Sequence, residues 1–287
     1  MKKLLTGILL AVLVLALAAC GTKDEGKKDS QTSGDGKGDT GSEVTELKIG
    51  ASNTPHAIIL EKVKPLLKEK GVELKIEKYQ DYILPNQDLE SGEIDANYFQ
   101  HIPYLETQMA DHGYKFVNAG EIHIEPIGIY SKEYKSLEEL PEGALVLISN
   151  SVADHGRVLG LLEAKGLIKL AEGIDKTKAE VKDIVENPKN LQFDAKNDPA
   201  ILPQFFNQGE GDIVLINTNF AIDAGLNPLE DAIEMEDSAE SPYLNIIAVR
   251  EGDENNAEIK ALVEVLKSQE IQDYILEEWN GEIVPVK

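Results

Sequence analysis

The sequence predicts an α/β protein built from two lobes of similar design with a cleft between them. Residues 47–77 show a strand–helix–strand order, which is typical of a mainly parallel sheet flanked by helices. In addition, residues 92–95 and 209–212 share the pattern Gly-Glu-x-Asp, 117 residues apart, and each leads from an expected helix into an expected strand. Coincidence is the alternative explanation of this repeat, because such glycine turns are common between helices and strands.

The composition sets the class of protein. At 287 residues the chain is long enough for two domains, and its 42% hydrophobic content allows a sizeable core. Its formal net charge of −24 argues against nucleic acid as a partner, because the phosphates would be repelled. Its single cysteine, Cys20, excludes an intrachain disulfide.

The N-terminus predicts a signal peptide over residues 1–19, followed by a lipid-attachment cysteine. Two lysines precede an uncharged, mostly apolar run, Leu4–Ala19, which is shorter than the about 20 residues that a membrane span needs. Residues 17–21, Leu-Ala-Ala-Cys-Gly, resemble the bacterial lipobox, which implies cleavage before Cys20 and acylation of its thiol. A transmembrane anchor with an incidental cysteine is the alternative. We therefore expect a lipid-anchored protein on the extracytoplasmic face of the cell membrane.

Residues 20–46 are expected to hold the lipidated Cys20 and a disordered tether. The segment after the cysteine is rich in Gly, Ser, Thr, Asp, Glu and Lys, and Val44 is its only aliphatic residue. It cannot bury enough apolar surface to offset the entropy of ordering. As a flexible coil it would reach about 25–30 Å. Such a tether would keep the globular body close to a partner in the membrane.

Lobe 1 is expected over residues 47–130, completed by residues 239–287. The pattern of apolar residues and glycine stops predicts its elements. In chain order they are a strand at 47–51, a helix from Thr54 to before Gly71, a strand at 72–77, a loop at 82–86, a strand after Gly92, a helix at 103–111, extended segments at 122–129, a strand at 245–249 and one long helix at 257–279.

Lobe 2 is expected over residues 131–238. Residues 144–148 read as an apolar strand, and Asn150 or Ser151 can cap the helix that follows. A further helix is expected to end at Asn187-Pro188. The second Gly-Glu-x-Asp turn then leads into an apolar strand over residues 213–216.

The stretch from Asp95 to Tyr104 has the composition of a pocket wall. It places Tyr98, Phe99 and His101 at the end of an expected buried strand. Apolar and aromatic side chains with a few polar groups are typical of small-molecule sites. The alternative is that the aromatic residues belong to the core and that His101 is a buried histidine with satisfied hydrogen bonds.

Arg157 is the leading candidate for binding an anion. It is one of only two arginines and falls in the second turn of the helix expected to start near Ser151. A helix N-terminus carries partial positive charge and free N–H groups. The guanidinium adds a planar fork that matches a carboxylate. An exposed or ion-paired helix arginine is the alternative.

Two asparagines at strand ends could complete such a site. Asn217 follows a buried strand and Asn245 begins another. An amide oxygen can accept from an ammonium group, and an amide NH₂ can donate to a carboxylate. One arginine and two asparagines could therefore hold both charged ends of a free amino acid. The alternative is that they only cap the strand ends.

Patterns of catalytic residues are weak or absent. The sequence has no Gly-x-Ser-x-Gly, no phosphate-binding glycine loop and no His-Glu-x-x-His. His123-x-Glu125 could place two ligands on one strand face, but nothing else has metal-ligand spacing. Asp154-His155 suggests a base, yet no nucleophile can be paired with it from sequence. We expect no catalytic residue, no cofactor and no metal.

The chain resembles the methionine-binding lipoprotein family, the substrate-binding component of a bacterial ABC methionine importer. The resemblance covers Leu47 to Pro285 together with the lipobox. Five segments carry it: Gln80-Asp-Tyr-Ile-Leu-Pro-Asn86, Asp95-Ala-Asn-Tyr-Phe-Gln-His-Ile-Pro-Tyr-Leu105, Val185-Glu-Asn-Pro-Lys-Asn-Leu191, Ile216-Asn-Thr-Asn-Phe-Ala221 and Ser241-Pro-Tyr-Leu-Asn245.

The resemblance implies a type II periplasmic-binding-protein fold. In this fold two α/β lobes, each a mainly parallel sheet flanked by helices, are joined by two crossover strands. It implies a monomeric protein without enzyme activity that captures methionine between its lobes and delivers it to a membrane permease and its ATPase. It also implies site roles: Arg157 for the ligand carboxylate, Asn217 and Asn245 for the rest of the amino-acid backbone, and Tyr82, Tyr98, Phe99 and His101 for the thioether pocket.

One loop departs from the family pattern and keeps alternatives open. Many relatives carry Asn-Asp-Pro-Thr-Asn before the helix arginine, whereas this chain has Asn150-Ser-Val-Ala-Asp154. The ligand could therefore be a methionine-containing dipeptide or another apolar amino acid. A surface adhesion or interaction lipoprotein with a vestigial cleft is an alternative of a different class.

Overall fold

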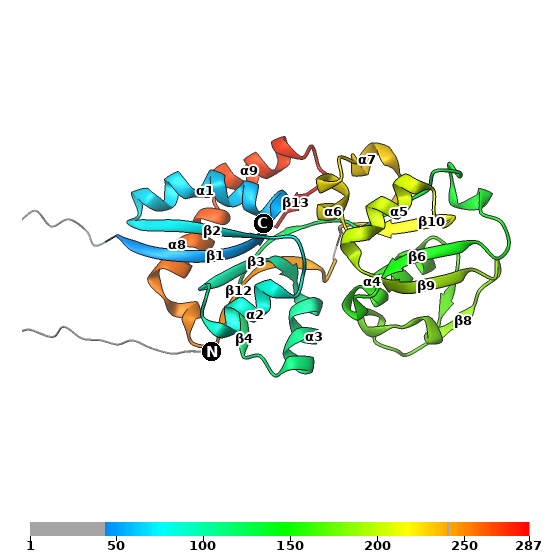
Figure 1. Cartoon of the computed structure of the whole chain (residues 1–287), viewed down its shortest axis with the longest axis horizontal. Helices are drawn as coiled ribbons and strands as arrows, with labels where there is room; N and C mark the ends of the chain where they lie inside the picture. The colour runs from blue at the N-terminus through cyan, green and yellow to red at the C-terminus, as the bar shows by residue number, and fades with distance from the viewer. Residues whose placement is uncertain (1–43, 240, 287) are drawn as a thin grey trace, which may run out of the picture. The chain divides into compact units, whose positions relative to one another are not determined.

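Two β-sheets, each with helices on both faces, form two lobes (Figure 1). The computed structural model describes residues 44–239 and 241–286. The expected signal peptide, Cys20 and most of the expected tether therefore lie outside the described residues. The first strand begins at Thr45, two residues before the expected start. Within the described part of the chain, no helix is both long enough and apolar enough to cross a membrane.

The sheet of lobe 1 has six strands in the order β13-β4-β12-β3-β1-β2. Their bounds are β1 Thr45–Ser52, β2 Val72–Tyr79, β3 Ala96–His101, β4 Phe116–Ile124, β12 Leu244–Arg250 and β13 Val284–Pro285. β1 pairs parallel with β2 and β3, whereas β12 runs antiparallel to β3 and β4, and β13 runs antiparallel to β4.

The sheet of lobe 2 has five strands in the order β11-β5-β10-β6-β9. Their bounds are β5 Gly128–Tyr130, β6 Leu145–Ser149, β9 Gln192–Asn197, β10 Ile213–Ile216 and β11 Ala232–Met235. β6 pairs parallel with β9 and β10, whereas β5 runs antiparallel to β10 and β11. A separate two-stranded sheet pairs β7 (Lys169–Leu170) with β8 (Ile184–Glu186).

Most strands of each sheet run in one direction, as expected, but both sheets are mixed, because β12 in lobe 1 and β5 in lobe 2 run against their neighbours. The reason lies in the path of the chain between the lobes. β12 is the strand by which the chain re-enters lobe 1, and β5 is the strand by which it enters lobe 2. Each of them starts at the side that faces the other lobe. Each of these two strands is therefore antiparallel to neighbouring strands whose carboxyl ends lie at that side.

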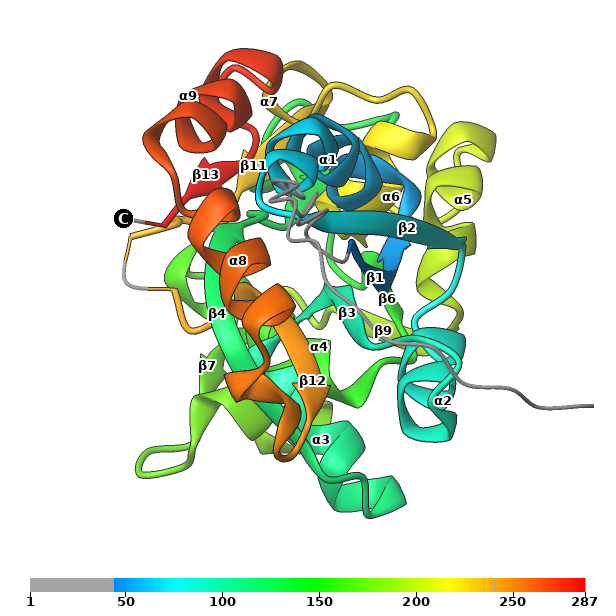
Figure 2. The ribbon, with the colours of Figure 1, turned by 90° about the vertical axis from the view of Figure 1, so that its left-hand side faces the viewer.

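Helices cover both faces of the lobe 1 sheet (Figure 2). Their bounds are α1 Ile58–Glu69, α2 Leu84–Ser91, α3 Ile102–His112, α8 Ala257–Leu266 and α9 Gln269–Glu278, with short helices η1 Asn53–Ala57 and η6 Asp253–Asn255. The alternation of β12 shows the two layers. Ile247 and Val249 pack with α1, α8 and α9, whereas Ile246 and Ala248 pack with α2 and α3.

Lobe 2 repeats this three-layer design. Its helices are α4 Val152–Ala164, α5 Leu202–Gln208, α6 Thr218–Asp223 and α7 Pro228–Asp231, with short helices η2 Leu137–Glu139, η3 Lys176–Lys178, η4 Val181–Asp183 and η5 Pro199–Ile201. Along β10, Ile213 and Leu215 pack on the side of α4, whereas Val214 and Ile216 pack on the side of α5 and α6.

The two Gly-Glu-x-Asp turns have the same local structure. Gly92 ends α2 and Gly209 ends α5, both with positive φ, which glycine adopts without steric cost. The Asp95 carboxylate accepts the backbone N–H of Lys48 at 2.9 Å, and the Asp212 carboxylate accepts that of Leu145 at 2.6 Å. In both lobes the aspartate thus aligns its own strand with the neighbouring one.

The chain crosses between the lobes twice. The first crossing runs from the end of β4 at Ile124 to the start of β5 at Gly128, so it comes before the expected boundary at residue 130. The second runs from the end of β11 at Met235 to the start of β12 at Leu244. The two segments touch each other, because the Glu236 N–H donates to the Ile127 carbonyl at 2.9 Å.

Three further expectations of secondary structure were wrong. The residues before Asn187 form strand β8, which pairs with β7, and no α-helix. The long terminal helix is two helices, because Ser268 turns its hydroxyl to the Val265 carbonyl at 2.6 Å and then starts α9. The loop expected at 82–86 turns into α2 at Leu84, since the Asp81 carboxylate caps the first free N–H groups.

Candidate functional site

A pocket lies between the lobes, at the edges where the parallel strands of both sheets end. About 380 Å³ of space lies between its atoms, a figure that includes its opening to solvent. Lobe 1 and the first crossover contribute Tyr82, Phe99, Gln100, His101, Tyr104, Glu125 and Asn245. Lobe 2 contributes Asp154, Arg157, Asn217, Thr218 and Asn219. Ligands of α/β proteins bind outside the carboxyl ends of strands for the same topological reason.

Six of the seven ligand residues expected from sequence line this pocket: Tyr82, Phe99, His101, Arg157, Asn217 and Asn245. The seventh, Tyr98, does not. Its ring is fully buried under α1, 4.5 Å from the His56 ring, and its hydroxyl lies 2.5 Å from His123 Nδ1. Consecutive strand residues face opposite sides of a sheet, so Phe99 and Tyr98 could not share one wall.

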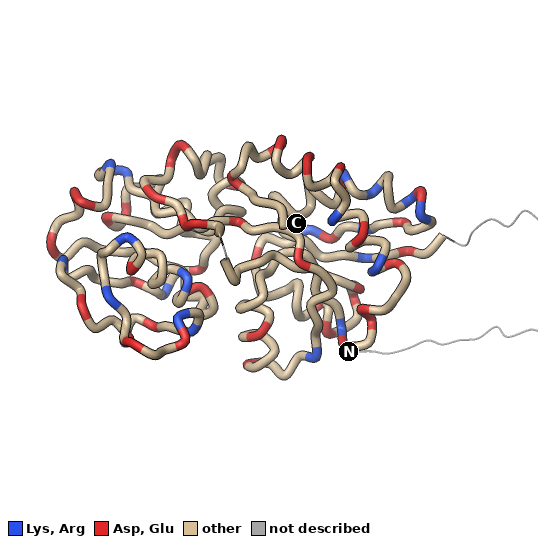
Figure 3. The backbone as a smooth tube through the Cα atoms, turned by 180° about the vertical axis from the view of Figure 1, so that it is seen from behind, with Lys and Arg blue, Asp and Glu red and all other residues tan. Residues whose placement is uncertain are grey.

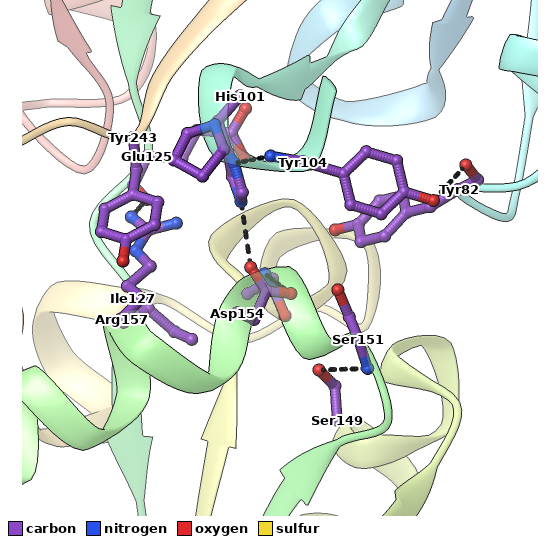
Figure 4. Close-up of polar contacts among 12 residues, drawn as sticks. Tyr82, His101, Tyr104, Glu125, Ile127, Ser149, Ser151, Asp154, Arg157 and Tyr243 are labelled. Carbon is purple, nitrogen blue, oxygen red and sulfur yellow. Dashed lines mark hydrogen bonds and ion pairs between the residues drawn. The ribbon is translucent and has the colours of Figure 1, made fainter. Parts of the chain in front are cut away.

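His101 joins the two lobes. It is the N-cap residue of α3, and its Nδ1 accepts the Tyr104 backbone N–H at 3.1 Å. The ring proton is therefore on Nε2, which donates to Asp154 Oδ1 at 2.9 Å. Figure 4 shows this contact between the aromatic wall of lobe 1 and α4 of lobe 2.

Asp154 is a buried carboxylate on the pocket side of α4. Burial acts to raise its pKa, but the hydrogen bond from His101 and the positive charge of Arg157 outweigh this effect and lower the pKa below its ordinary value. The amide nitrogen of Asn217 lies 3.4 Å from the second carboxylate oxygen. Asp154 therefore carries negative charge in the pocket at neutral pH.

Arg157 lies one turn further along α4 and is also buried. Its Nε donates to both carboxylate oxygens of Glu236, at 3.1 and 2.9 Å, and its Nη2 donates to Glu236 and to the Glu125 carbonyl. The guanidinium carbon is 4.7 Å from the centre of the Tyr243 ring (Figure 4). Nη1 makes no hydrogen bond to any described residue, and it is the part of the fork that remains for a ligand.

Glu125 is held by two buried histidines beneath the pocket. Its Oε1 lies 3.1 Å from His56 Nε2 and 2.8 Å from His123 Nε2. The Nδ1 atoms face hydroxyls, Ser52 at 2.6 Å for His56 and Tyr98 for His123. His56 Nε2 is also 3.0 Å from the amide oxygen of Asn245. Both histidines thus carry their proton on Nε2: His123 donates it to Glu125, and His56 donates it to the Asn245 oxygen with Glu125 close by.

Burial keeps these imidazoles neutral. It lowers the pKa of His56 to about 4 and that of His123 to about 3. Burial also raises the pKa of Glu125, against the opposing positive charge of Arg157. The three groups converge within 4.8 Å, as cation ligands do, but every ring nitrogen already has a hydrogen-bond partner within the described chain. We interpret the cluster as a hydrogen-bonded support for the Glu125 carboxylate.

Tyr82 closes the mouth of the pocket. Its hydroxyl donates to the Asn219 side-chain oxygen at 2.6 Å, and its ring lies 4.9 Å from Phe220, so it bonds lobe 1 to lobe 2. The Tyr104 hydroxyl donates to the Tyr82 carbonyl at 2.7 Å and fixes this loop within lobe 1. Outside Tyr82 and Asn219 lies a separate groove.

Six lining residues were not expected from sequence: Gln100, Tyr104, Glu125, Asp154, Thr218 and Asn219. Asp154 could have been found, because a residue three positions before Arg157 on the same helix shares its face. His155, next to it, points away and contacts the Ser149 carbonyl at 2.9 Å. Glu125 was noticed only as a possible metal ligand. Nothing in its neighbourhood in the sequence indicates that it faces a pocket.

The charges of the pocket differ from those of the surface. Aspartate and glutamate residues are spread along the backbone of both lobes (Figure 3). The pocket instead contains one guanidinium, from Arg157, opposite two carboxylates, from Asp154 and Glu125. Both signs of charge together with aromatic side chains suit a small zwitterion with an apolar tail. The fold and the pocket define a two-lobed solute-binding protein of the periplasmic type.

Comparisons with known proteins give the particular family. The family model described as NlpA lipoprotein matches residues 47–287, so the chain belongs to the NlpA lipoprotein family. A methionine-binding lipoprotein, MetQ, of Bacillus subtilis is 48% identical over 290 residues, covering 100% of this chain and 99% of that protein. A nutrient-binding protein of Burkholderia cenocepacia, solved bound to methionine, is 40% identical with a TM-score of 0.79 and covers 84% of this chain and 100% of its own. A periplasmic substrate-binding protein of an ABC transporter from Coxiella burnetii is 36% identical, with a TM-score of 0.78 and coverages of 84% and 100%.

Proposed function

We propose that this protein is the substrate-binding lipoprotein of an ABC importer and that it captures methionine between its lobes. The observation that carries the proposal is the unlike character of the two pocket walls. Lobe 1 presents Tyr82, Phe99 and Tyr104, whereas lobe 2 presents Asp154 and Arg157. A free amino acid with an unbranched apolar side chain matches both walls at once.

Each end of the ligand has a partner in this arrangement. The ligand carboxylate binds Arg157 Nη1, and the amides of Asn217 and Asn245 complete its hydrogen bonds. The carboxylates of Glu125 and Asp154 balance the ligand ammonium. The thioether lies against Phe99 and the neighbouring rings, because sulfur makes favourable contacts with aromatic side chains. Contacts to both lobes stabilise the closed arrangement, which is how ligand binding drives lobe closure.

The size and closure of the pocket favour a single amino acid over a methionine-containing dipeptide. Tyr82 and Asn219 separate the pocket from the outer groove, so a second residue would have to displace their hydrogen bond. The adhesion or interaction alternative has less support, because a vestigial cleft would not need buried charges such as those of Asp154 and Arg157.

The proposal extends to the membrane and the transporter. The lipobox supports acylation at Cys20 and anchoring on the extracytoplasmic face of the membrane. The methionine-binding lipoprotein and the ABC-transporter protein among the relatives support delivery to a permease and its ATPase. We propose that the protein acts as a monomer and without catalysis.

The direct test is to identify the ligand. The full chain is purified in detergent, unfolded to release bound small molecules, and the extract is analysed by mass spectrometry. We expect methionine. The refolded protein is then titrated by calorimetry with methionine, methionine-containing dipeptides and other apolar amino acids, and we expect methionine to bind most tightly at one site. Failure to recover or bind methionine, with tight binding of another compound, would replace the ligand. Binding of none would favour the adhesion alternative.

A further inference from the structure

Arg157 offers the proposed ligand only one of its three nitrogens, and the other two are engaged by the protein. Nε and Nη2 bind the Glu236 carboxylate, and Nη2 also donates to the Glu125 carbonyl at 2.5 Å. The direction of Nη1 is therefore set by the Glu236 carboxylate and the Glu125 carbonyl. Glu236 is not among the residues that line the pocket.

Glu236 contacts the guanidinium from the side away from the pocket. Arg157 separates the pocket from a second hollow of about 620 Å³, and Glu236 and Tyr243 line this hollow. Because Glu236 lies behind the guanidinium, it does not occupy the place of a ligand carboxylate. Tyr243 covers one face of the guanidinium, with 4.7 Å between the guanidinium carbon and the ring centre.

Glu236 itself has little freedom. Its Oε2 accepts the Ile127 backbone N–H at 3.2 Å, and its own N–H donates to the Ile127 carbonyl at 2.9 Å. It thus sits where the two crossover segments touch, and only 13% of its side chain is exposed. A glutamate whose main chain and side chain are both hydrogen-bonded can hold the arginine side chain in one orientation.

We infer that Glu236 is the positioning residue that aims Arg157 Nη1 at the carboxylate of the bound amino acid. The inference rests on the proposed function for the identity of the ligand. Positioning and simple electrostatics predict opposite changes in ligand affinity when Glu236 is removed. A negative charge close to the ligand carboxylate repels it, so on charge alone the removal of Glu236 would strengthen binding. Positioning predicts that its removal weakens binding.

Calorimetric titration of the full-length chain with methionine distinguishes positioning by Glu236 from simple charge repulsion. We expect Glu236→Ala to raise the Kd by about tenfold to a hundredfold, the range for losing one charged hydrogen bond to the ligand. Glu236→Gln keeps an acceptor oxygen for Nε and is expected to stay within about threefold of wild type. Glu234→Ala is the matched control, because it removes a carboxylate two residues away, at the end of β11, that pairs with Lys165 instead. Wild-type or tighter binding by Glu236→Ala overturns the inference.

A spectroscopic measurement tests the positioning without any ligand. The chain has only two arginines, so its nitrogen-15 spectrum contains two Nε–H signals, and Arg250→Lys identifies the signal of Arg157. We expect slow exchange of the Arg157 Nε–H with water in wild type and in Glu236→Gln, and fast exchange in Glu236→Ala. If Glu236→Ala fails to fold, the Glu236→Gln variant tests the inference in its place. Fast exchange of the Arg157 Nε–H together with tighter methionine binding in Glu236→Gln overturns the inference. Wild-type protein that does not bind methionine contradicts the proposed function, and the exchange rate alone then decides whether Glu236 holds Arg157.

Discussion

The two lobes share one local design and use it for different chemistry. In both, a glycine ends a helix and an aspartate aligns the next strand through a backbone N–H, of Lys48 in lobe 1 and of Leu145 in lobe 2. The strand after the first turn ends in Phe99 and His101, whereas the strand after the second ends before Asn217. The turn therefore fixes where a pocket wall forms, and the few residues after it decide whether that wall is aromatic or polar.

The walls also differ in what supports them. Behind the lobe 1 side lie two neutral histidines: His123 links Tyr98 to Glu125 by hydrogen bonds, and His56 links Ser52 to Asn245. Behind the lobe 2 side lies the ion pair of Arg157 with Glu236. The first support makes the stability of the fold depend on pH in the mildly acidic range. Changes in the two walls, in the support of lobe 1 and at the mouth of the pocket should each have a separate effect.

The largest effect is expected from the polar wall. Arg157→Ala should raise the Kd for methionine at least about a hundredfold, because a buried ligand carboxylate would lose its cationic partner, at a cost of about 3–5 kcal/mol. Calorimetry measures this change. Arg250→Ala is the control, since that arginine binds the Leu89 and Ile94 carbonyls and is not among the pocket residues. Equal losses of methionine affinity in the two variants would show that Arg157 has no specific role in binding.

The support of lobe 1 should make the fold sensitive to acid. The unfolded chain protonates histidine near pH 6.5, whereas the folded chain protonates His56 only near pH 4 and His123 only near pH 3. The unfolded state thus binds more protons between these values, and stability falls as the pH falls from 6.5 toward 4. The raised pKa of Glu125 acts in the opposite direction.

From pH 7 to pH 5 we expect each of these two histidines to reduce the free energy of unfolding by about 2 kcal/mol. Urea unfolding at the two pH values measures the loss. His123→Gln should remove about half of this pH dependence, whereas His112→Gln, on the exposed end of α3, should leave it unchanged. A wild-type stability that is the same at both pH values would mean that the imidazoles are not buried in their neutral form.

A smaller effect is expected from the aromatic wall. Phe99→Leu keeps an apolar side chain but removes the ring, and contacts between sulfur and aromatic rings contribute about 0.3–1.5 kcal/mol. We expect weaker methionine binding by up to about tenfold. Norleucine, which replaces the sulfur by a methylene group, should lose less affinity than methionine. A variant that weakens both ligands equally would show that the wall recognises shape alone.

The smallest effect is expected at the mouth. Tyr82→Phe removes the hydrogen bond to Asn219 that joins the lobes, which contributes about 0.5–1.5 kcal/mol. Ligand release, followed by stopped-flow fluorescence, should become up to about tenfold faster. Tyr104→Phe removes a hydroxyl bond within lobe 1 and should change release less. The reverse order would mean that the mouth opens by movement within lobe 1.

Sequence patterns predict the parts of this molecule that depend on neighbours along the chain. The apolar strand and Ser151, which stands at the N-cap position without a side-chain cap, mark the start of the helix that carries Arg157, so the place of the arginine at a pocket edge could be predicted. Its partner Glu236 could not, because 79 residues separate them and a single glutamate in a crossover carries no pattern.

Strand direction and side-chain facing show the same limit. Tyr98 and Phe99 are adjacent and similar, and only the position of the sheet between two helical layers decides that one lies under α1 and the other in the pocket. The antiparallel strands β5 and β12 likewise follow from the path between the lobes and not from their composition. Local signals thus predicted the two-lobed α/β class, whereas the mixed sheets and half of the pocket lining depend on contacts between distant segments.

The uneven division of the chain between the sheets bears on the order of folding during synthesis. All five strands of the lobe 2 sheet come from one continuous stretch, residues 128–235, whereas the lobe 1 sheet has β12 at its centre and needs residues 244–250. Chains fold from the N-terminus as they emerge, and domains fold as units. The inserted lobe can therefore be complete while its host still lacks a central strand. Until β12 is synthesised, the earlier strands of lobe 1 leave an unpaired sheet edge exposed. Such an edge can pair with another chain, so the nascent protein is most prone to aggregation during this interval.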